Sequence, residues 1–217
     1  MKQTVLVLGL VFALCLATVP AQGADPGWNL RVFAAGFDPD LDVVVPAENP
    51  DEVRVKADSD LGYGASLEYQ FSHLLGVELG FFQASPAIML IAEDIPGYGD
   101  IYLTDNMSTT AVTLDVNFHL TPSSPYFDFY LGAGLASMGY GNLRYLEPDG
   151  DTLDLTTGND LGYSAKAGLG ISLGKDSNWA AFGGLRYIWS DLDVTQEETA
   201  TFDFNIFSFT VGISYNF

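Results

Sequence analysis

The chain has 217 residues, of which 48% are hydrophobic and 13% aromatic, and its 28 Asp and Glu outnumber its eight Lys and Arg. The length suits a single domain, and the net charge of −20 argues against nucleic acid as a partner, because that binding relies on clustered basic side chains. No apolar run after the first 25 residues reaches the ~18 residues that a membrane-spanning helix requires.

A segment typical of a cleaved export signal opens the chain. Lys2 precedes an apolar stretch at 4–17, and the triplets 19–21 (VPA) and 21–23 (AQG) both offer the small residues of a cleavage site. The apolar run is short for a membrane anchor, and Pro20 and acidic residues follow it at once. We therefore predict a signal peptide at 1–23 and a mature domain at 24–217. Cys15, the single cysteine, lies in the signal, so the mature chain can form no disulfide.

Eight segments in the mature chain alternate between apolar and small or polar residues. Each is about as long as the ~9–11 residues with which a tilted β-strand crosses a bilayer. The clearest is 205–217, where every second residue from Phe207 to Phe217 is large and apolar, and the residues between them are small and uncharged. The other seven are 28–37, 61–71, 75–81, 112–120, 127–135, 161–173 and 179–189.

The connections between these segments alternate in length. Short ones lie at 72–74, 121–125 and 174–178, and long ones lie at 38–60, 84–106, 138–160 and 190–204. A soluble lipocalin-like barrel also has eight strands but gives no reason for this alternation. We predict an all-β fold, an eight-stranded antiparallel transmembrane up-and-down β-barrel of the Gram-negative outer membrane, with short turns in the periplasm and long loops outside. The sequence DLGY occurs at 60–63 and again at 160–163, which places Tyr63 and Tyr163 at the outer aromatic girdle.

Several of these segments resemble the OmpW family of small outer-membrane barrels. The motifs are LEYQF at 67–71 leading into LGVEL at 75–79, VNFHLTP at 116–122 followed by YLGAG at 130–134, and the ending VGISYNF at 211–217. The resemblance implies a narrow pore for small apolar molecules, with a lumen open to the outside and a lateral exit toward the bilayer. It assigns no functional residue to a position in this chain. The terminal Phe217 also resembles the signal by which the barrel-assembly machinery recognises its substrates.

Alternation directs seven charged residues into the barrel. An eight-stranded barrel is barely wide enough for its own side chains, so these charges should pair. They form either a structural plug that fixes the strand register or a polar gate. The seven residues are Arg31, Glu68, Glu78, Asp115, Asp128, Lys166 and Arg186.

The outer half of the lumen is expected to be apolar and widened by glycines. Phe33, Phe37, Phe82 and Ile188 face inward there, together with Gly and Ala, and the charged residues fall at mid-height or below. This pattern predicts a funnel above a charged plug, suited to a small apolar ligand that enters from outside rather than to a continuous water channel.

The four long connections hold 22 of the 28 acidic residues. They are expected to form a solvated rim beside outer-membrane lipid and lipopolysaccharide, whose phosphates divalent cations bridge. The spacing of Asp38, Asp40 and Asp42 suits Ca²⁺ but lacks the glycine and the distal glutamate of an EF-hand loop. We therefore predict no metal site and no cofactor.

Enzymatic activity is not expected. A catalytic histidine would have to reach a substrate in the outer leaflet, and His73 and His119 both fall at the periplasmic end, about 25–30 Å away. The alternative to an uptake route is a structural or adhesive barrel that acts through its acidic loops. The tyrosines that would make contacts there are Tyr98, Tyr102, Tyr140 and Tyr145.

Overall fold

The computed structural model describes residues 27–46, 52–95, 99–121, 124, 126–146, 150–174, 177–195 and 199–217. The predicted signal peptide at 1–23 lies outside these ranges. Within them, no helix is long and apolar enough to span a membrane.

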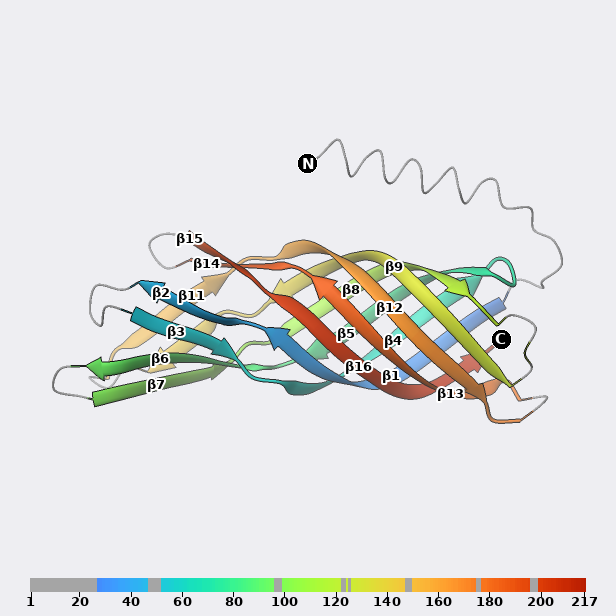
Figure 1. The fold of residues 1–217 in the computed structure, drawn as a ribbon, viewed down its shortest axis with the longest axis horizontal. Helices are drawn as coiled ribbons and strands as arrows, with labels where there is room; N and C mark the ends of the chain where they lie inside the picture. Colours follow the sequence, from blue (N-terminus) through green and yellow to red (C-terminus); the bar gives the residue numbers. More distant parts are fainter. Residues whose placement is uncertain are drawn as a thin grey trace, which may run out of the picture.

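Eight antiparallel strands close into a barrel, which confirms the predicted fold (Figure 1). Each strand pairs with its neighbours in the barrel sequence, and β1 closes the ring by pairing with β16 from Asn29–Asn216 to Asp40–Asn205. The barrel strands are β1 (Gly27–Asp40), β4 (Asp60–Gln70), β5 (Leu75–Ala84), β8 (Thr109–His119), β9 (Phe127–Tyr140), β12 (Asp160–Ser172), β13 (Trp179–Trp189) and β16 (Asn205–Asn216).

The outer surface of the barrel is apolar, as the alternation predicted. On β16, Phe209, Val211 and Ile213 are exposed, whereas Ser208 and Ser214 on either side of this stretch are buried. A soluble barrel would direct its large apolar side chains inward, so this inverted pattern is typical of a barrel surrounded by lipid.

Short connections join the barrel strands at one end, called here the turn end. In the turn between β4 and β5, the Ser72 hydroxyl accepts hydrogen bonds from the backbone N–H groups of Leu74 (3.3 Å) and Leu75 (3.0 Å). The chain terminus lies at the same end, where the Phe217 N–H donates to the carbonyl oxygen of Trp28 at 2.9 Å. The Phe217 side chain is exposed, and its ring centroid lies 4.9 Å from that of Tyr215.

The long connections at the opposite end, the extension end, are not the loops that we predicted. Each contains two further strands, and these form two four-stranded sheets in the orders β2-β3-β6-β7 and β10-β11-β14-β15 (Figure 1, at the left). Their strands are β2 (Asp42–Pro46), β3 (Glu52–Ala57), β6 (Ala87–Ile95), β7 (Gly99–Asn106), β10 (Leu143–Leu146), β11 (Thr152–Thr157), β14 (Asp191–Thr195) and β15 (Thr199–Asp203). Inward apolar residues such as Val55 and Leu155 explain why these connections form strands, because they continue the alternation of apolar residues beyond the barrel.

The repeated DLGY segments occupy equivalent places in the fold. The Asp60 carboxylate accepts a hydrogen bond from the backbone N–H of Ser85 (2.7 Å), and the Asp160 carboxylate accepts one from that of Asp191 (2.8 Å). Both carboxylates therefore accept from a backbone N–H group of the neighbouring strand, at the point where that strand passes into the extension. Tyr63 and Tyr163 are exposed on the outer surface, in agreement with a girdle position.

Candidate functional site

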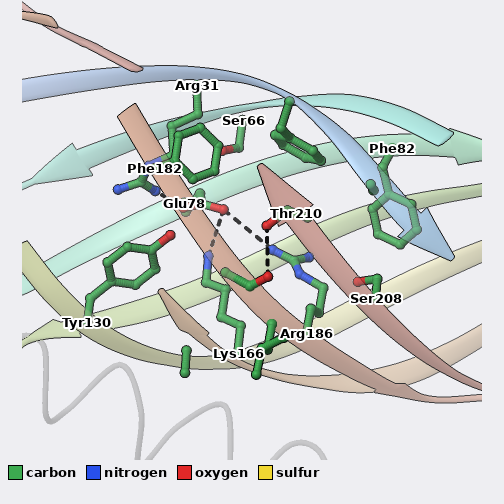
Figure 2. Close-up of a pocket in the computed structure, with 15 residues that line it drawn as sticks. Arg31, Ser66, Glu78, Phe82, Tyr130, Lys166, Phe182, Arg186, Ser208 and Thr210 are labelled. Atoms are coloured by element: carbon green, nitrogen blue, oxygen red, sulfur yellow. Dashed lines mark hydrogen bonds and ion pairs between the residues drawn. The ribbon is translucent and has the colours of Figure 1, made fainter. Parts of the chain in front are cut away.

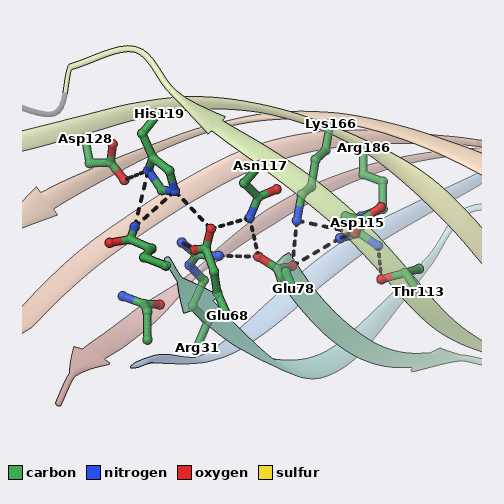
Figure 3. Close-up of polar contacts among 12 residues, drawn as sticks. Arg31, Glu68, Glu78, Thr113, Asp115, Asn117, His119, Asp128, Lys166 and Arg186 are labelled. Carbon is green, nitrogen blue, oxygen red and sulfur yellow. Dashed lines mark hydrogen bonds and ion pairs between the residues drawn. The ribbon is translucent and has the colours of Figure 1, made fainter. Parts of the chain in front are cut away.

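Six of the seven charged residues that we predicted to face the lumen lie in one connected group inside the barrel (Figure 3). Their side chains are at most 11% exposed. Ion pairs link all of them without a break, so they are treated together as the charged cluster. Its members are Arg31, Glu68, Glu78, Asp115, Lys166 and Arg186.

Like charges of the cluster lie on neighbouring strands. Glu78 on β5 lies directly opposite Glu68 on β4 and opposite Asp115 on β8 in the strand ladders. Elsewhere in the barrel, Lys166 on β12 lies opposite Arg186 on β13. Like charges directly opposite each other on neighbouring strands destabilise a sheet. The ion pairs between the acids and the bases offset this repulsion.

Glu78 is at the centre of the charged cluster. Its carboxylate lies 2.6 Å from Lys166 Nζ and 3.5 Å from Arg186 Nη2, and it also accepts a hydrogen bond from Arg31. Arg31 Nη2 reaches Glu68 Oε2 at 2.6 Å. Asp115 completes the set, at 3.0 Å from Arg186 and 3.3 Å from Lys166. Every buried charge of the cluster thus has an opposite charge in contact.

His119 joins the seventh predicted residue, Asp128, to this network. Its ring nitrogens lie 2.8 Å from Asp128 Oδ2 and 2.9 Å from Glu68 Oε1. Two carboxylates can both accept from one ring only if both nitrogens carry hydrogen, so the geometry fits an imidazolium ion. Sequence reasoning missed this link, although alternation along β8 directs His119 inward together with Asp115. Asp128 itself has a side chain that is 38% exposed at the turn end.

Two aromatic residues that we did not single out also contact the cluster. The Arg31 guanidinium lies 4.8 Å from the ring centroid of Tyr130 and 5.8 Å from that of Phe182. Both rings are buried, and alternation along β9 and β13 would have identified them as inward-facing. They cover the cation with π-faces, which attract positive charge at low solvent exposure.

The glycines on the inner wall do not widen the lumen as we predicted. At Gly64 the space of a missing side chain is taken by Phe33, and at Gly80 it is taken by the Thr113 hydroxyl. A residue with a Cβ at these positions would collide with those groups. The prediction was wrong because the space beside a glycine is filled from neighbouring strands, which a single-strand pattern does not show.

The four residues of the predicted funnel face inward, but they surround no open space. Phe37 is 1% exposed, Phe82 is 4% exposed and Ile188 is fully buried; Phe33 packs against them. They belong to one continuous cluster, called here the apolar core, which runs from the barrel into the two extension sheets. Its buried members are Phe37, Leu41, Ala57, Phe82, Ala84, Ile88, Met107, Ala111, Ala136, Met138, Tyr140, Leu143, Tyr145, Ile188, Leu192, Phe204 and Ile206. The outer half of the lumen is therefore filled rather than funnel-shaped.

A cavity of about 30 Å³ separates the apolar core from the charged cluster (Figure 2). Phe33 and Phe82 line it on the core side, and Lys166 and Arg186 line it on the cluster side. A second, polar cavity of about 310 Å³ lies at the turn end below the cluster, where His119 and other polar side chains line it. The charged cluster thus stands between two cavities of opposite character.

The tyrosines expected to make surface contacts fall into different environments. Tyr102 is 62% exposed on β7, whereas Tyr140 and Tyr145 are buried in the apolar core, so the prediction of surface contacts was wrong for these two. The Tyr145 hydroxyl donates to the carbonyl oxygen of Ile88 at 3.3 Å, and burial raises the pKa of this hydroxyl. Tyr98 lies outside the described residues.

Some acidic residues of the extension end are paired or hydrogen-bonded locally. Asp42 accepts two hydrogen bonds from Arg54 at 2.6 Å, which lower the pKa of the Asp42 carboxyl, and Asp38 accepts one from the Ser59 hydroxyl. Across the described part of the chain, no three His, Cys, Asp or Glu side chains are arranged to hold a metal ion.

Comparison with solved structures places the fold among small outer-membrane barrels. The chain is similar to OprG from Pseudomonas aeruginosa (TM-score 0.62, 15% identity, 91% of this chain and 98% of that one). It is similar to AlkL in lipid bilayers (TM-score 0.59, 17% identity, 92% and 95%) and to the neisserial surface protein NspA (TM-score 0.53, 11% identity, 88% and 97%). The resemblance to OmpW-like barrels is thereby confirmed for the fold.

The sequence itself gives the same assignment. No curated protein matches the chain significantly. The family model of the outer membrane protein beta-barrel domain, in contrast, matches residues 6–217, nearly the whole chain. The chain therefore belongs to the outer membrane protein beta-barrel domain family.

Proposed function

We propose that this barrel is an uptake route for small apolar molecules, which enter at the extension end from the extracellular side. The observation that carries the proposal is the apolar core, which continues without a polar break from the two extension sheets into the barrel. It ends at the cavity lined by Phe33 and Phe82. A small apolar molecule that enters this core exchanges apolar contacts for apolar contacts, whereas a sugar would lose its hydration.

The charged cluster sets the lower limit of this route. Its six buried side chains would have to separate before any solute passed along the barrel axis, and separating buried ion pairs is costly. The barrel is therefore not a continuous pore, and apolar molecules leave through its wall toward the bilayer.

The wall has a candidate exit between β2 and β15. The ladder between β1 and β16 ends at Asp40–Asn205, and beyond it no ladder joins β2 to β15 in the described ranges. At this seam lies a groove of about 530 Å³, which Tyr187 and Phe207 line together with Lys56 and four aspartates, Asp38, Asp40, Asp42 and Asp58. Aromatic side chains at this level suit the boundary between headgroups and acyl chains.

A matched pair of substitutions on β1 tests the proposal. Ala35 lines the cavity and is buried, and its neighbour Ala34 is exposed on the outer surface. Uptake of a small apolar dye is measured in cells that lack the protein, that carry it, or that carry either variant. Ala35→Leu should reduce uptake toward that of cells without the protein, whereas Ala34→Leu should not.

Two results would contradict the proposal. One is equal dye uptake with and without the protein. The other is rapid swelling of proteoliposomes in small sugars, which would indicate a water-filled pore instead of the filled lumen described above.

The alternative function is binding at the cell surface. Surface binding is favoured because the extension forms two sheets, and these present exposed Tyr102 and Leu146 to the solvent. If Tyr102→Ala with Leu146→Ala abolished attachment to a surface while dye uptake was the same with and without the protein, surface binding would be the better account.

A further inference from the structure

The cavity between the apolar core and the charged cluster has a strongly uneven distribution of charge. All three cations of the cluster, Arg31, Lys166 and Arg186, line this cavity. Among the described residues that line it, Glu78 is the single acid; Glu68 and Asp115 are fully buried and do not line it. The cluster is balanced as a whole, but the face that it presents to the cavity is cationic (Figure 2).

Lys166 has hydrogen-bonding capacity to spare at this face. Its Nζ atom lies 2.6 Å from Glu78 and 3.3 Å from Asp115, so two carboxylates face this ammonium. An ammonium group carries three donors, and an unmet buried donor has a free-energy cost. An acceptor placed in the cavity beside Lys166 would therefore receive the third donor.

Aromatic rings also line the same cavity. They belong to Phe33, Phe82 and Phe182, and the rings of Phe33 and Phe182 meet edge to face with centroids 6.1 Å apart. Ser208 and Thr210 from β16 line it as well and add two hydroxyl groups. The cavity, at about 30 Å³, has room for a headgroup of a few atoms but not for a whole ligand.

From this arrangement we propose that the preferred ligands are small apolar monocarboxylates, whose carboxylate binds at Lys166 and Arg186 while the hydrocarbon chain lies in the apolar core. This inference rests on the proposed uptake function and specifies its substrate class. A cationic ligand would meet three like charges, and a neutral hydroxyl would accept from Lys166 without the added attraction of a negative charge. Charge-assisted hydrogen bonds are the stronger ones, so the carboxylate is the headgroup that gains most at this place.

The test compares octanoate with 1-octanol, which have equal chain length and differ in the headgroup. Binding of each labelled probe to the exported protein in nanodiscs is measured by equilibrium dialysis at neutral pH, with binding to empty nanodiscs subtracted. We expect a preference for octanoate of roughly tenfold, the size of effect that a charge-assisted hydrogen bond supplies. The ¹⁵N resonance of the Lys166 ammonium should shift with octanoate and not with 1-octanol.

A charge-balanced variant locates the effect. Lys166→Met combined with Asp115→Asn removes one cation and one acid and leaves no excess buried charge, and the preference for octanoate should be lost. Arg144→Gln with Asp154→Asn removes a comparable pair, 3.2 Å apart, from the solvent-exposed extension and should keep the preference. Recovery of folded barrel is checked for both by the shift in gel mobility on heating.

The outcomes separate this inference from the proposed function. Equal binding of both probes refutes the carboxylate preference and leaves uptake of apolar molecules intact. Binding of neither probe removes both. A preference that survives in the Lys166→Met, Asp115→Asn variant, or a Lys166 resonance that octanoate does not move, shows that the carboxylate binds elsewhere and overturns the assignment.

Discussion

Replacing Glu78 with glutamine should destabilise the barrel more than any other single loss of charge in the lumen. Glu78 is 3% exposed and contacts all three cations of the charged cluster, Arg31, Lys166 and Arg186. Glu78→Gln therefore leaves three buried cations facing two acids. Removing one partner of a buried ion pair costs about 3–5 kcal/mol, because the remaining charge is left without compensation.

The same reasoning predicts that a second substitution restores much of this loss. In Glu78→Gln with Lys166→Met, two cations face two acids and an apolar side chain replaces the unpaired ammonium. Replacing a buried ion pair by apolar groups of similar volume is often close to neutral. We expect the double variant to be more stable than Glu78→Gln alone, by about 2 kcal/mol or more.

The free energy of unfolding can be measured by urea titration of the barrel in lipid vesicles, followed by tryptophan fluorescence. Trp28, Trp179 and Trp189 are all exposed on the outer surface, so unfolding transfers them from lipid to water. Asp154→Asn is a suitable control: its partner Arg144 and Asp154 itself are each 69% exposed, and the loss should stay below about 1 kcal/mol. If Glu78→Gln costs no more than this control, or if Lys166→Met adds to its effect, the charged cluster does not hold the barrel in the way described.

Three further predictions concern other parts of the structure. Tyr145→Ala removes a side chain that is 1% exposed in the apolar core of the extension. The loss should lower the free energy of unfolding by about 3–5 kcal/mol. In intact cells, added protease should then cleave the extension but not the barrel. Gly132→Val places a side chain where the Lys166 stem lies, and should lower the midpoint of urea unfolding; a midpoint equal to that of the unaltered protein would contradict the packing. Burial, together with neighbouring acids that include Asp203, raises the pKa of the Asp191 carboxyl, so Asp203→Asn should lower that pKa toward its ordinary value in a ¹³C NMR titration; an unchanged or higher value would contradict the predicted coupling.

The direction of each side chain on the barrel strands could be predicted from the sequence, because it depends only on alternation within one strand. The inward position of Arg31 and Lys166 and the outward position of Phe209 follow from that rule alone. Which charges meet depends instead on register and on distances across the lumen. A contact between His119 and Asp128 could have been predicted, because both residues face inward on neighbouring strands. The second contact of His119, with Glu68 on β4, could not.

The occupancy of the lumen could not be predicted, because it depends on several strands at once. Gly64 suggested space when its strand was considered alone, and Phe33 on the neighbouring strand fills it. The extension sheets were missed for a related reason. Residues such as Val43 and Val55 alternate over only a few positions, which is too short a pattern to distinguish a strand from a loop rich in acids.

The charged cluster also determines which register the strands adopt, which the apolar surface alone does not. A slip of one residue would turn every apolar side chain of a strand into the lumen, but a slip of two preserves the outward face. Hydrophobicity therefore cannot distinguish the native register from one shifted by two. In the native register Glu78 lies opposite Asp115, within reach of Lys166 and Arg186; a shift of two along β8 would place Thr113 or Asn117 there and move the acid away from both cations. The charged cluster thus selects one register among those that the bilayer would accept, whether or not an apolar ligand ever rests on it.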